Sequence, residues 1–248
     1  MEQKPEIKFK TIHQEIIEST IPVSNKMIDD GETESFMLNC DEQTAGRGSG
    51  DRKWVTRRGN VFTTFNLREE FLPKEIKNVA AFLIGISICE KLNEISTDKF
   101  CIKWPNDVLC KDEGKVCGIL VDKYKNFYQL SFGVNLVDCP EVSEMRKGGR
   151  NPCHLGKHVN VEKIPNALKF SEDICKNICE KINKLSAKEI MDEWKKNANF
   201  NIKITKRGDT SEKEYQPLEV NEDGWLKVKD DEGKEEVIQP MFPYLNKP

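Results

Sequence analysis

The sequence predicts an α/β (α+β) fold in which helices cover one sheet, followed by a small β-barrel. Runs rich in β-branched and aromatic residues, several bounded by Gly, Asp or Asn, are typical of strands. Between and after these runs, apolar residues recur at intervals of three and four, as on one face of a helix. After about Asn199 the pattern changes to short alternating strands with turn signals. We therefore expect one domain over residues 1–198 and a second over residues 199–248.

Five runs in the first part of the chain predict strands of one sheet. They cover residues 35–40, 60–67, 100–104, 118–122 and 127–135. Pro73 opens a stretch whose apolar positions, within 76–92, follow helical spacing and predict a helix packed on that sheet. A second periodic stretch over 164–185 predicts another helix, and Ser186 followed by Glu189 is the pattern of a capping box that begins a third.

The last part of the chain is acidic and predicts four short strands. They fall within residues 200–207, 217–220, 225–230 and 235–239. Residues 209–236 hold eleven Asp and Glu against four Lys, a local balance of −7. We interpret this charge as the solvated surface of the barrel, with a docking role as the alternative.

Composition argues against several classes of function. The 248 residues are 37% hydrophobic, enough for a real core, and 39 Lys and Arg against 42 Asp and Glu leave a formal net charge of −3. This balance does not favour nucleic-acid or membrane partners. The longest nearly apolar run, 79–89, is too short to span a membrane, and the first ten residues lack the apolar stretch of a secretory signal. The nine cysteines form no CxxC pair, so we expect a reducing compartment, most simply the cytoplasm.

A glycine- and arginine-rich segment, residues 46–60 (GRGSGDRKWVTRRGN), is the most informative part of the chain. Its five basic residues against the single acid Asp51 give a local charge of +4. They are Arg47, Arg52, Lys53, Arg57 and Arg58. Glycines permit close approach of the backbone to a ligand, and arginines donate charge-assisted hydrogen bonds to phosphate oxygens. We interpret the segment as a phosphate-binding loop, with a solvated surface turn as the alternative; it matches neither the Rossmann fingerprint nor the P-loop pattern.

A second polar cluster lies at the end of the predicted strand 100–104. Lys103 is the penultimate residue of this strand, Asn106 and Asp107 follow the strand closely, and Lys115 leads into the next strand. These residue types supply a point charge for phosphate, a hydrogen-bonding amide and an oxygen ligand for Mg²⁺. An isolated Lys115 would be more typical of an exposed hairpin. In combination the cluster indicates a nucleotide site.

Taken together, the motifs resemble those of the biotin protein ligases. They are EST (18–20), EQTAGRGSGDRKW (42–54), KWPND (103–107), GKVCGIL (114–120) and FGVN (132–135), in the order and spacing of that family. The resemblance covers roughly residues 15–135. It implies an α/β ligase domain with a mixed sheet, followed by a small SH3-like barrel. Only eighteen residues precede Ser19, too few for the helix-turn-helix domain of some members, so we do not expect a repressor function.

The resemblance also implies roles for individual residues. Those that match the biotin contacts are Ser19, Thr20, Gln43 and Gly118. Those that match nucleotide or adenylate contacts are Gly46, Arg47, Gly48, Arg52, Lys53, Trp54, Lys103, Asn106 and Asn135. Lys115 matches the essential lysine and is, with Arg47, the expected catalytic group, while Asp107 matches a Mg²⁺ position. The departures from the family pattern are Ser49 in place of an arginine, Ile21 in place of an asparagine and Ser131 in place of a glycine.

The implied activity has two steps and uses biotin, ATP and Mg²⁺. Biotin's carboxylate attacks the α-phosphorus of ATP to give biotinyl-5′-AMP and pyrophosphate, and a lysine in the biotin carrier domain of a biotin-dependent carboxylase then displaces AMP. The first step brings anions together and needs cationic catalysts, and the second needs water to be kept out. A lipoate–protein ligase, which uses the same adenylation chemistry, is one alternative. A non-catalytic binder of nucleotide or RNA is the other.

Several cysteines and histidines are left outside this chemistry. The segment 153–158 (CHLGKH) lacks a fourth ligand at a recognisable spacing, so we expect a loop rather than a zinc site. Cys175 and Cys179 are expected in or beside the buried face of a helix. Cys117 is expected to fill a small-residue position on a strand.

Overall fold

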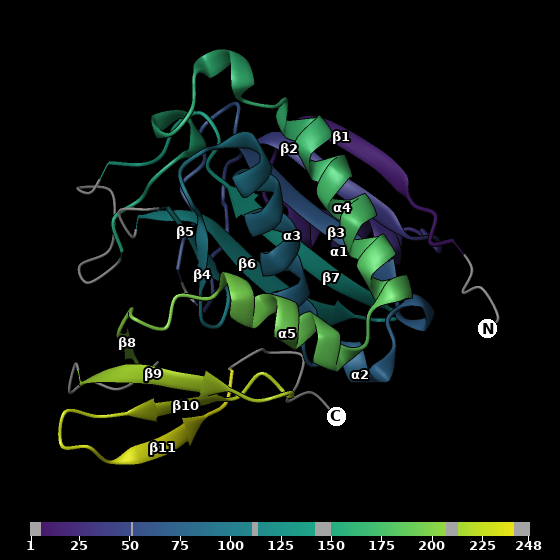
Figure 1. Cartoon of the computed structure of the whole chain (residues 1–248). Coiled ribbons are helices and arrows are strands. Elements are labelled where there is room, and N and C mark those ends of the chain that lie inside the picture. The colour runs from purple at the N-terminus through teal and green to yellow at the C-terminus, as the bar shows by residue number, and fades with distance from the viewer. Residues whose placement is uncertain (1–5, 51, 111–113, 142–149, 207–212, 241–248) are drawn as a thin grey trace.

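A seven-stranded mixed sheet forms the centre of the molecule, a computed structural model that describes residues 6–50, 52–110, 114–141, 150–206 and 213–240 (Figure 1). Its strands are β1 (Lys10–Ile17), β2 (Phe36–Gln43), β3 (Val61–Arg68), β4 (Cys101–Lys103), β5 (Asp107–Leu109), β6 (Lys115–Tyr124) and β7 (Phe127–Val134). They lie in the order β1-β2-β3-β7-β6-β5-β4. β1 runs parallel to β2, and the other neighbouring pairs are antiparallel. The expected mixed sheet is confirmed.

Helices cover the two faces of this sheet unequally. α3 (Ala80–Ile95) and α4 (Ala167–Lys184) lie side by side on one face, and α5 (Ala187–Asn197) packs against α3 (Figure 1). Successive side chains of a strand point to opposite faces, and on β2 Met37 joins the core beneath α3 and α4. Phe36 and Leu38 instead join Ile28 of α1 (Thr20–Asp29) on the other face. That second face also holds the cleft described below.

The helix predicted after Pro73 is divided in two, which corrects the sequence prediction. α2 (Lys74–Lys77) and α3 are separated by Asn78 and Val79, and Val79 leaves the helical conformation at φ −108° and ψ 10°. The Val79 side chain is fully buried, and its N–H donates to Ile76 O at 3.0 Å in a tight turn. Packing of the chain onto the sheet therefore overrides an uninterrupted helical periodicity.

The later helices begin at capping residues. Asn166 accepts a hydrogen bond from the Lys169 N–H at 3.1 Å and begins α4. The predicted capping box is confirmed, since Ser186 and Glu189 bond reciprocally at the start of α5. Residue 164, where the periodicity starts, ends a short 3₁₀ helix, η4 (Val161–Lys163). Among the helices in the described part of the chain, none is both long and apolar enough to cross a membrane.

Two strands and one α-helix lie outside the sequence predictions: β1, β5 and α1. β1 is an edge strand whose side chains are mostly exposed, so it lacks the alternation of a half-buried strand. α1 carries Pro22 in its first turn, where the missing N–H of proline is tolerated, but proline and β-branched residues obscure a helical pattern. β5 has only three residues, too few for a periodicity to be read.

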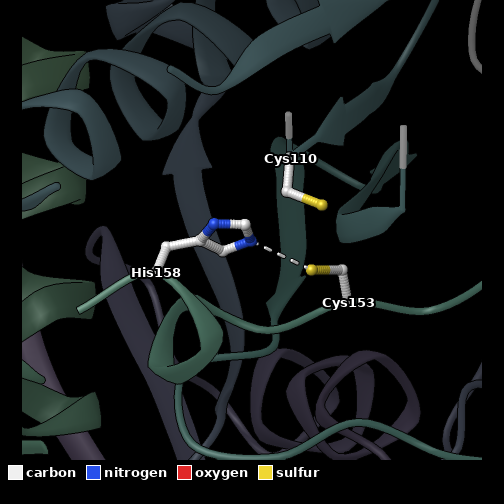
Figure 2. Close-up of side chains that lie close together, drawn as sticks. All are labelled: Cys110, Cys153 and His158. Atoms are coloured by element: carbon white, nitrogen blue, oxygen red, sulfur yellow. Dashed lines mark hydrogen bonds between the residues drawn. The ribbon is translucent and has the colours of Figure 1, made fainter. Parts of the chain in front are cut away.

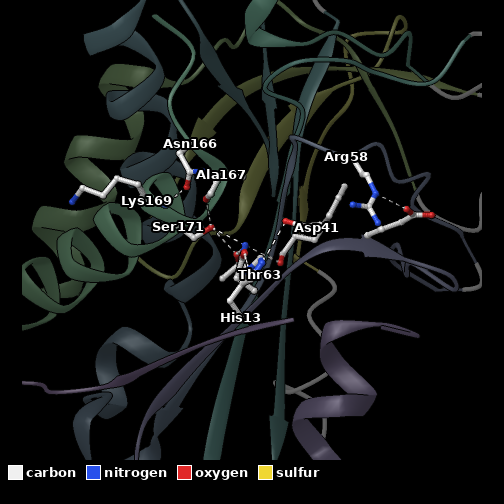
Figure 3. Close-up of polar contacts among 11 residues, drawn as sticks. His13, Asp41, Arg58, Thr63, Asn166, Ala167, Lys169 and Ser171 are labelled. Carbon is white, nitrogen blue, oxygen red and sulfur yellow. Dashed lines mark hydrogen bonds and ion pairs between the residues drawn. The ribbon is translucent and has the colours of Figure 1, made fainter. Parts of the chain in front are cut away.

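A buried polar network joins α4 to the sheet (Figure 3). Asn39 of β2, Thr63 of β3 and Ser171 of α4 are almost fully buried and hydrogen bonded to one another at 2.8–3.2 Å. His13 of β1 extends the network through a 2.9 Å contact between its Nδ1 and Asn39 Oδ1. Buried polar groups are costly unless paired, so this pairing specifies how α4 sits on the strands.

A second, four-stranded antiparallel sheet follows α5 (Figure 1). Its strands are β8 (Ile204–Thr205), β9 (Glu214–Val220), β10 (Leu226–Lys229) and β11 (Glu235–Ile238), in the order β11-β10-β9-β8. This sheet confirms the change of pattern after Asn199 and is consistent with an SH3-like barrel. Residues 207–212, which include the end of the predicted strand 200–207 and the start of the acidic segment 209–236, lie outside the described residues. The domain boundary between 198 and 199 stays a prediction.

Candidate active site

An open cleft lies on the α1 side of the sheet. It is formed by the start of α1, the end of β2, the loop that follows β2, and strands β6 and β7. Nine of the predicted site residues line it: Ser19, Thr20, Gln43, Arg47, Gly48, Trp54, Asn106, Lys115 and Gly118. Residues from both predicted clusters and from the EST motif therefore meet in one place.

One wall of the cleft is a chain of hydrogen bonds. The Thr20 N–H donates to Gln43 Oε1 at 2.8 Å, which ties α1 to the end of β2. Thr64 Oγ1 of β3 contacts Thr20 Oγ1 at 2.8 Å and Ser131 Oγ of β7 at 2.9 Å. Ser19, the residue that begins α1, is almost fully buried beside them. This wall offers hydroxyl and amide groups to a polar, uncharged part of a ligand.

Lys115, which lines the cleft, forms an ion pair with Asp107. Lys115 Nζ lies 2.6 Å from Asp107 Oδ1, and the two side chains are only 23% and 20% exposed. Burial by itself favours the neutral carboxyl, but the nearby charges of Lys115 and Lys103 outweigh it and hold the pKa of Asp107 below its usual range. Asp107 is therefore ionised at neutral pH and holds the Lys115 ammonium at the cleft.

Lys103 and Asn106 support this pair from the neighbouring turn. Lys103 on β4 lies opposite Asp107 on β5 in the antiparallel strand register. Burial lowers the pKa of Lys103, although the negative charge of Asp107 by itself would raise it. Asn106 Nδ2 donates to Ile119 O at 2.7 Å, which fastens the KWPND turn to β6. An anion that binds near Lys103 would stabilise the charged form of the lysine, which burial disfavours.

The loop after β2 folds as a tight hairpin over the cleft. The Trp54 N–H donates to Gly46 O at 2.9 Å, and the Gly48 N–H donates to Arg52 O at 2.7 Å. A Cβ on Gly46 would lie 2.4 Å from Trp54 O, so this close backbone approach requires glycine. Arg52 Nε donates to Ser49 O at 2.9 Å, and its Nη2 also contacts Ser49 Oγ. Residue 51, the single acid of the loop, lies outside the described residues.

Trp54 closes the floor of the cleft. Its ring lies over two glycines that face each other across β6 and β7, Gly118 and Gly133, and a Cβ on either would come within 2.9 Å of the indole. Lys115 Nζ is 5.5 Å from the ring centroid, within cation–π range. The Trp54 Nε1 is buried without a hydrogen-bond partner among the described residues. The indole thus occupies apolar space between the glycines and the catalytic lysine candidate.

The other six predicted residues support the cleft without lining it. They are Gly46, Arg52, Lys53, Lys103, Asp107 and Asn135. Lys53 pairs with Arg47 in an isolated bridge of the loop hairpin. Asn135 is buried just after β7, where its Nδ2 donates to Cys153 O at 3.0 Å and its side chain braces the segment that follows residue 150. The predicted contact of Asn135 with an adenylate stays a prediction.

The sequence predicts no binding role for the remaining residues of the cleft, although Ile21, Ser49 and Ser131 are the noted departures from the family pattern. The remaining residues are Ile21, Ser49, Phe62, Thr63, Ile119, Leu120, Ser131, Phe132 and Gly133. Most belong to strands that the sequence predicts, but only strand register shows which face they occupy. Gly133 could have been predicted as a cleft residue from its place in the FGVN motif, and the strand register sets it opposite Gly118.

The profile of the Biotin/lipoate A/B protein ligase family matches residues 15–136, the part of the chain that holds the cleft. Residues 15–136 of this chain belong to that family. Among curated relatives, the biotin--[acetyl-CoA-carboxylase] ligase of Mycobacterium tuberculosis is 30% identical over 112 residues, covering 44% of this chain and 42% of the relative. The ligase of the same name from Paracoccus denitrificans is 32% identical over 119 residues, covering 45% and 48%. The matches thus span less than half the length of these relatives.

Solved structures match nearly the whole chain. The biotin protein ligase of Leishmania major in complex with biotinyl-5-AMP superposes with a TM-score of 0.71 at 20% identity, covering 92% of this chain and 98% of that one. The biotin protein ligase of Aquifex aeolicus in complex with biotin and ATP gives 0.70 at 24% identity, covering 93% and 95%. These likenesses establish the fold.

Proposed function

We propose that this chain is a biotin protein ligase, which activates biotin with ATP as biotinyl-5′-AMP and transfers it to a lysine of a biotin carrier domain. The observation that carries the proposal is the Lys115–Asp107 pair at a cleft that also holds the glycine- and arginine-rich loop and the Thr20–Gln43 wall. Family membership of residues 15–136 and the named relatives support it. The nine free thiols support a reducing compartment, most simply the cytoplasm.

The first step joins two anions and therefore depends on cations. A biotin carboxylate oxygen attacks the α-phosphorus of ATP, the bond to the bridging oxygen breaks, and pyrophosphate leaves. Lys115 is held at the cleft by Asp107, and Arg47 lines the cleft from the loop, so both can bind phosphate oxygens as negative charge develops. Bound Mg²⁺ would neutralise phosphate charge, and ionised Asp107 fits it as one oxygen ligand, since Mg²⁺ takes most of its other ligands from phosphate and water.

The second step requires that the mixed anhydride is protected from water. The ε-amine of the carrier lysine attacks the acyl carbon, the bond to the phosphate oxygen breaks, and AMP leaves. Arg47, Gly48 and Ser49 line the cleft from the loop, where they can cover the intermediate. Trp54 shields the floor on the side of Lys115.

The polar wall favours biotin over lipoate as the acid. Biotin's ureido ring presents both donors and an acceptor, whereas the dithiolane of lipoate presents neither. Thr20, Gln43 and Ser131 place hydroxyl and amide groups along one side of the cleft. A site built to hydrogen-bond its ligand rejects an analogue that leaves these groups unpaired.

Exchange of labelled pyrophosphate into ATP tests the proposal directly. We expect exchange with biotin and Mg²⁺, little with lipoate, and none without an acid, followed by labelling of a carrier domain but not of its acceptor Lys→Arg variant. Equal or faster exchange with lipoate would identify a lipoate ligase. ATP binding without exchange for any acid would identify a non-catalytic nucleotide-binding protein.

A further inference from the structure

Cys110, Cys153 and His158 meet in the interior, outside the set of residues that line the cleft (Figure 2). The two Sγ atoms and a ring nitrogen of His158 all lie within 4.8 Å of one another. Cys110 is 1% exposed, Cys153 is 5% exposed and the His158 side chain is 5% exposed. Two thiols and an imidazole buried together are the donor set of a soft metal ion.

The spacing of these atoms suits a tetrahedral ion. Bonds of about 2.3 Å to sulfur and about 2.0–2.1 Å to nitrogen place neighbouring ligand atoms roughly 3.5–3.8 Å apart. Cys153 Sγ and His158 Nε2 are 3.3 Å apart, and the third atom completes a triangle no wider than 4.8 Å. Shifts of roughly 1 Å or less, within the reach of side-chain rotation, bring all three to bonding distance.

His158 is held in the orientation that a metal ligand needs. Its Nδ1 contacts Asp98 Oδ2 at 2.9 Å, which leaves Nε2 directed at the thiols. Asp98 is placed in turn by its N–H, which donates to Ser96 Oγ at 3.1 Å, and Phe100 packs edge-on against the imidazole. A carboxylate on the second ring nitrogen is the common partner of a metal-bound histidine.

The two thiols are positioned by the hairpin that leads to Lys115. The Cys110 N–H donates to Gly114 O and the Cys153 N–H donates to Lys115 O, both at 2.9 Å. A Cβ on Gly114 would lie 2.6 Å from Cys153 Cβ, so only glycine allows the two segments to approach this closely. The backbone therefore brings together cysteines that are far apart in the sequence.

We propose that Cys110, Cys153 and His158 bind one Zn²⁺ ion. Thiolates and imidazole select zinc over Mg²⁺, so this site is separate from the one that serves ATP. Water completes the tetrahedron, because the described residues offer three ligands within this triangle. A disulfide would use the thiols alone and leave the carboxylate-oriented imidazole without a role. The sequence prediction about zinc binding concerned residues 153–158 alone. It left Cys110 out, because no sequence motif links Cys110 to that distant segment.

The ion serves as a brace for the neighbouring active site. Cys110 directly follows β5, which carries Asp107, and Cys153 is bonded to the backbone of Lys115. His158 ends the short helix η3 (Leu155–Lys157) and reaches the α3–β4 connection through Asp98. Zinc thereby ties three separate segments behind the Lys115–Asp107 pair.

The test uses the full chain, reduced, stripped with EDTA and titrated with ZnCl₂ in competition with a chromophoric chelator. We expect one zinc per chain, and with CoCl₂ the intense visible bands and the thiolate charge-transfer band of a tetrahedral site. Cys110→Ser and Cys153→Ser should lose both signals. Cys179→Ser, which changes a buried thiol on α4, should keep both. Asp98→Asn, which removes the carboxylate behind His158, should weaken zinc binding by about 10–100-fold.

Thermal unfolding separates loss of the site from loss of the fold. Zinc at roughly 100 times its Kd should raise the Tm of the wild type by about 5–10 °C and leave the Tm of folded Cys110→Ser unchanged. A wild-type chain with all nine thiols reduced that takes up no zinc overturns the proposal. Zinc affinity in Cys110→Ser or Cys153→Ser equal to that of the wild type does the same.

Discussion

At the scale of single residues, the Lys115–Asp107 pair carries the proposed chemistry. The two residues lie on adjacent strands whose register shifts between Val108 and Leu109, and this irregularity accompanies the approach of their side chains to 2.6 Å. Asp107 restrains a flexible ammonium that would otherwise lose conformational entropy on binding a nucleotide. The pair is therefore a preorganised charge rather than a surface ion pair.

Lys115→Ala should reduce formation of biotinyl-AMP by at least about 100-fold, because it removes one preorganised charge from an anionic transition state. Biotin affinity should change far less, since the polar wall is untouched. Single-turnover adenylation and equilibrium biotin binding measure the two effects separately. Adenylation at the wild-type rate would show that Lys115 is only structural.

The ion pair should also make stability depend on pH in the acid range. The pKa of Asp107 is lower in the folded chain than its usual value of 3.8, so its ionised form stabilises the fold above that pH. The contribution is lost as pH falls below 3.8 through the folded-state pKa. Asp107→Asn should therefore lower the free energy of unfolding by about 1.5–3 kcal/mol at neutral pH. In urea titrations the difference should stay constant down to about pH 5 and shrink below about pH 4; a difference that persists at lower pH would contradict this origin.

Ser49 stands where many family members have an arginine, and Arg52 already contacts it. An arginine bond to the adenylate would be worth about 1.5–3 kcal/mol, or roughly 10- to 150-fold in escape of the intermediate. Arg52 Nε donates to Ser49 O, and the loop is strongly basic. We therefore expect another basic residue of the loop to supply the contact with the adenylate that an arginine at position 49 would make. Dissociation of biotinyl-AMP should then differ less than about fivefold between wild type and Ser49→Arg. A slowing of about tenfold or more would show that the natural loop retains the intermediate poorly.

At the scale of elements, the site depends on strand register. β6 and β7 are paired so that Gly118 opposes Gly133 and Leu120 opposes Ser131, all on the face of the cleft. Two facing glycines leave the space into which Trp54 packs. The loop after β2 therefore docks on a surface that exists only when the strands are in this register.

Gly133→Ala should displace Trp54, because the added Cβ would lie 2.9 Å from the indole. Overpacking of this kind costs about 1–3 kcal/mol, so biotin and ATP should bind about 10- to 100-fold more weakly and tryptophan fluorescence should change. Gly85→Ala is the matched control, since a Cβ there meets its nearest neighbours at an ordinary 3.6 Å. Unchanged affinity in Gly133→Ala would show that the packing of Trp54 on Gly133 is not needed for binding.

At the scale of the whole molecule, the KWPND turn links the site to the C-terminal sheet. Trp104 Nε1 donates to Gly224 O at 2.9 Å. Gly224 has φ +81°, and a Cβ there would lie 2.4 Å from a ring carbon of Phe82 on α3, so the turn before β10 sits tightly on α3. Docking of the small sheet is thus coupled to the strand end that carries Lys103.

Trp104→Phe should lower the Tm by about 2–5 °C, because it removes a hydrogen bond of about 0.5–1.5 kcal/mol across this contact. Trp225→Phe, which changes a side chain 39% exposed just before β10, should have little effect. Differential scanning calorimetry measures both. Equal shifts in the two variants would mean that the contact through Trp104 does not hold the sheets together.

Local sequence patterns determined the strong strands, the capping box at Ser186 and the two charged motifs, because each depends on neighbours within a few residues. The resemblance to a ligase family was carried by such motifs, and nine of the site residues predicted from them line the cleft. The exposed strand β1 and the short strand β5 were missed, since they have no periodicity of their own. The split between α2 and α3 was missed because burial of Val79 outweighs helical spacing.

Only the tertiary structure decided which distant groups meet. Strand register placed Gly133 opposite Gly118, and backbone pairing around Lys115 brought Cys153 to Cys110. Neither arrangement follows from spacing along the chain, because a contact between residues far apart in sequence depends on the packing of every element between them. The sequence by itself thus determined the local chemistry of the site, while the sheet and its loops decided the geometry in which that chemistry is held.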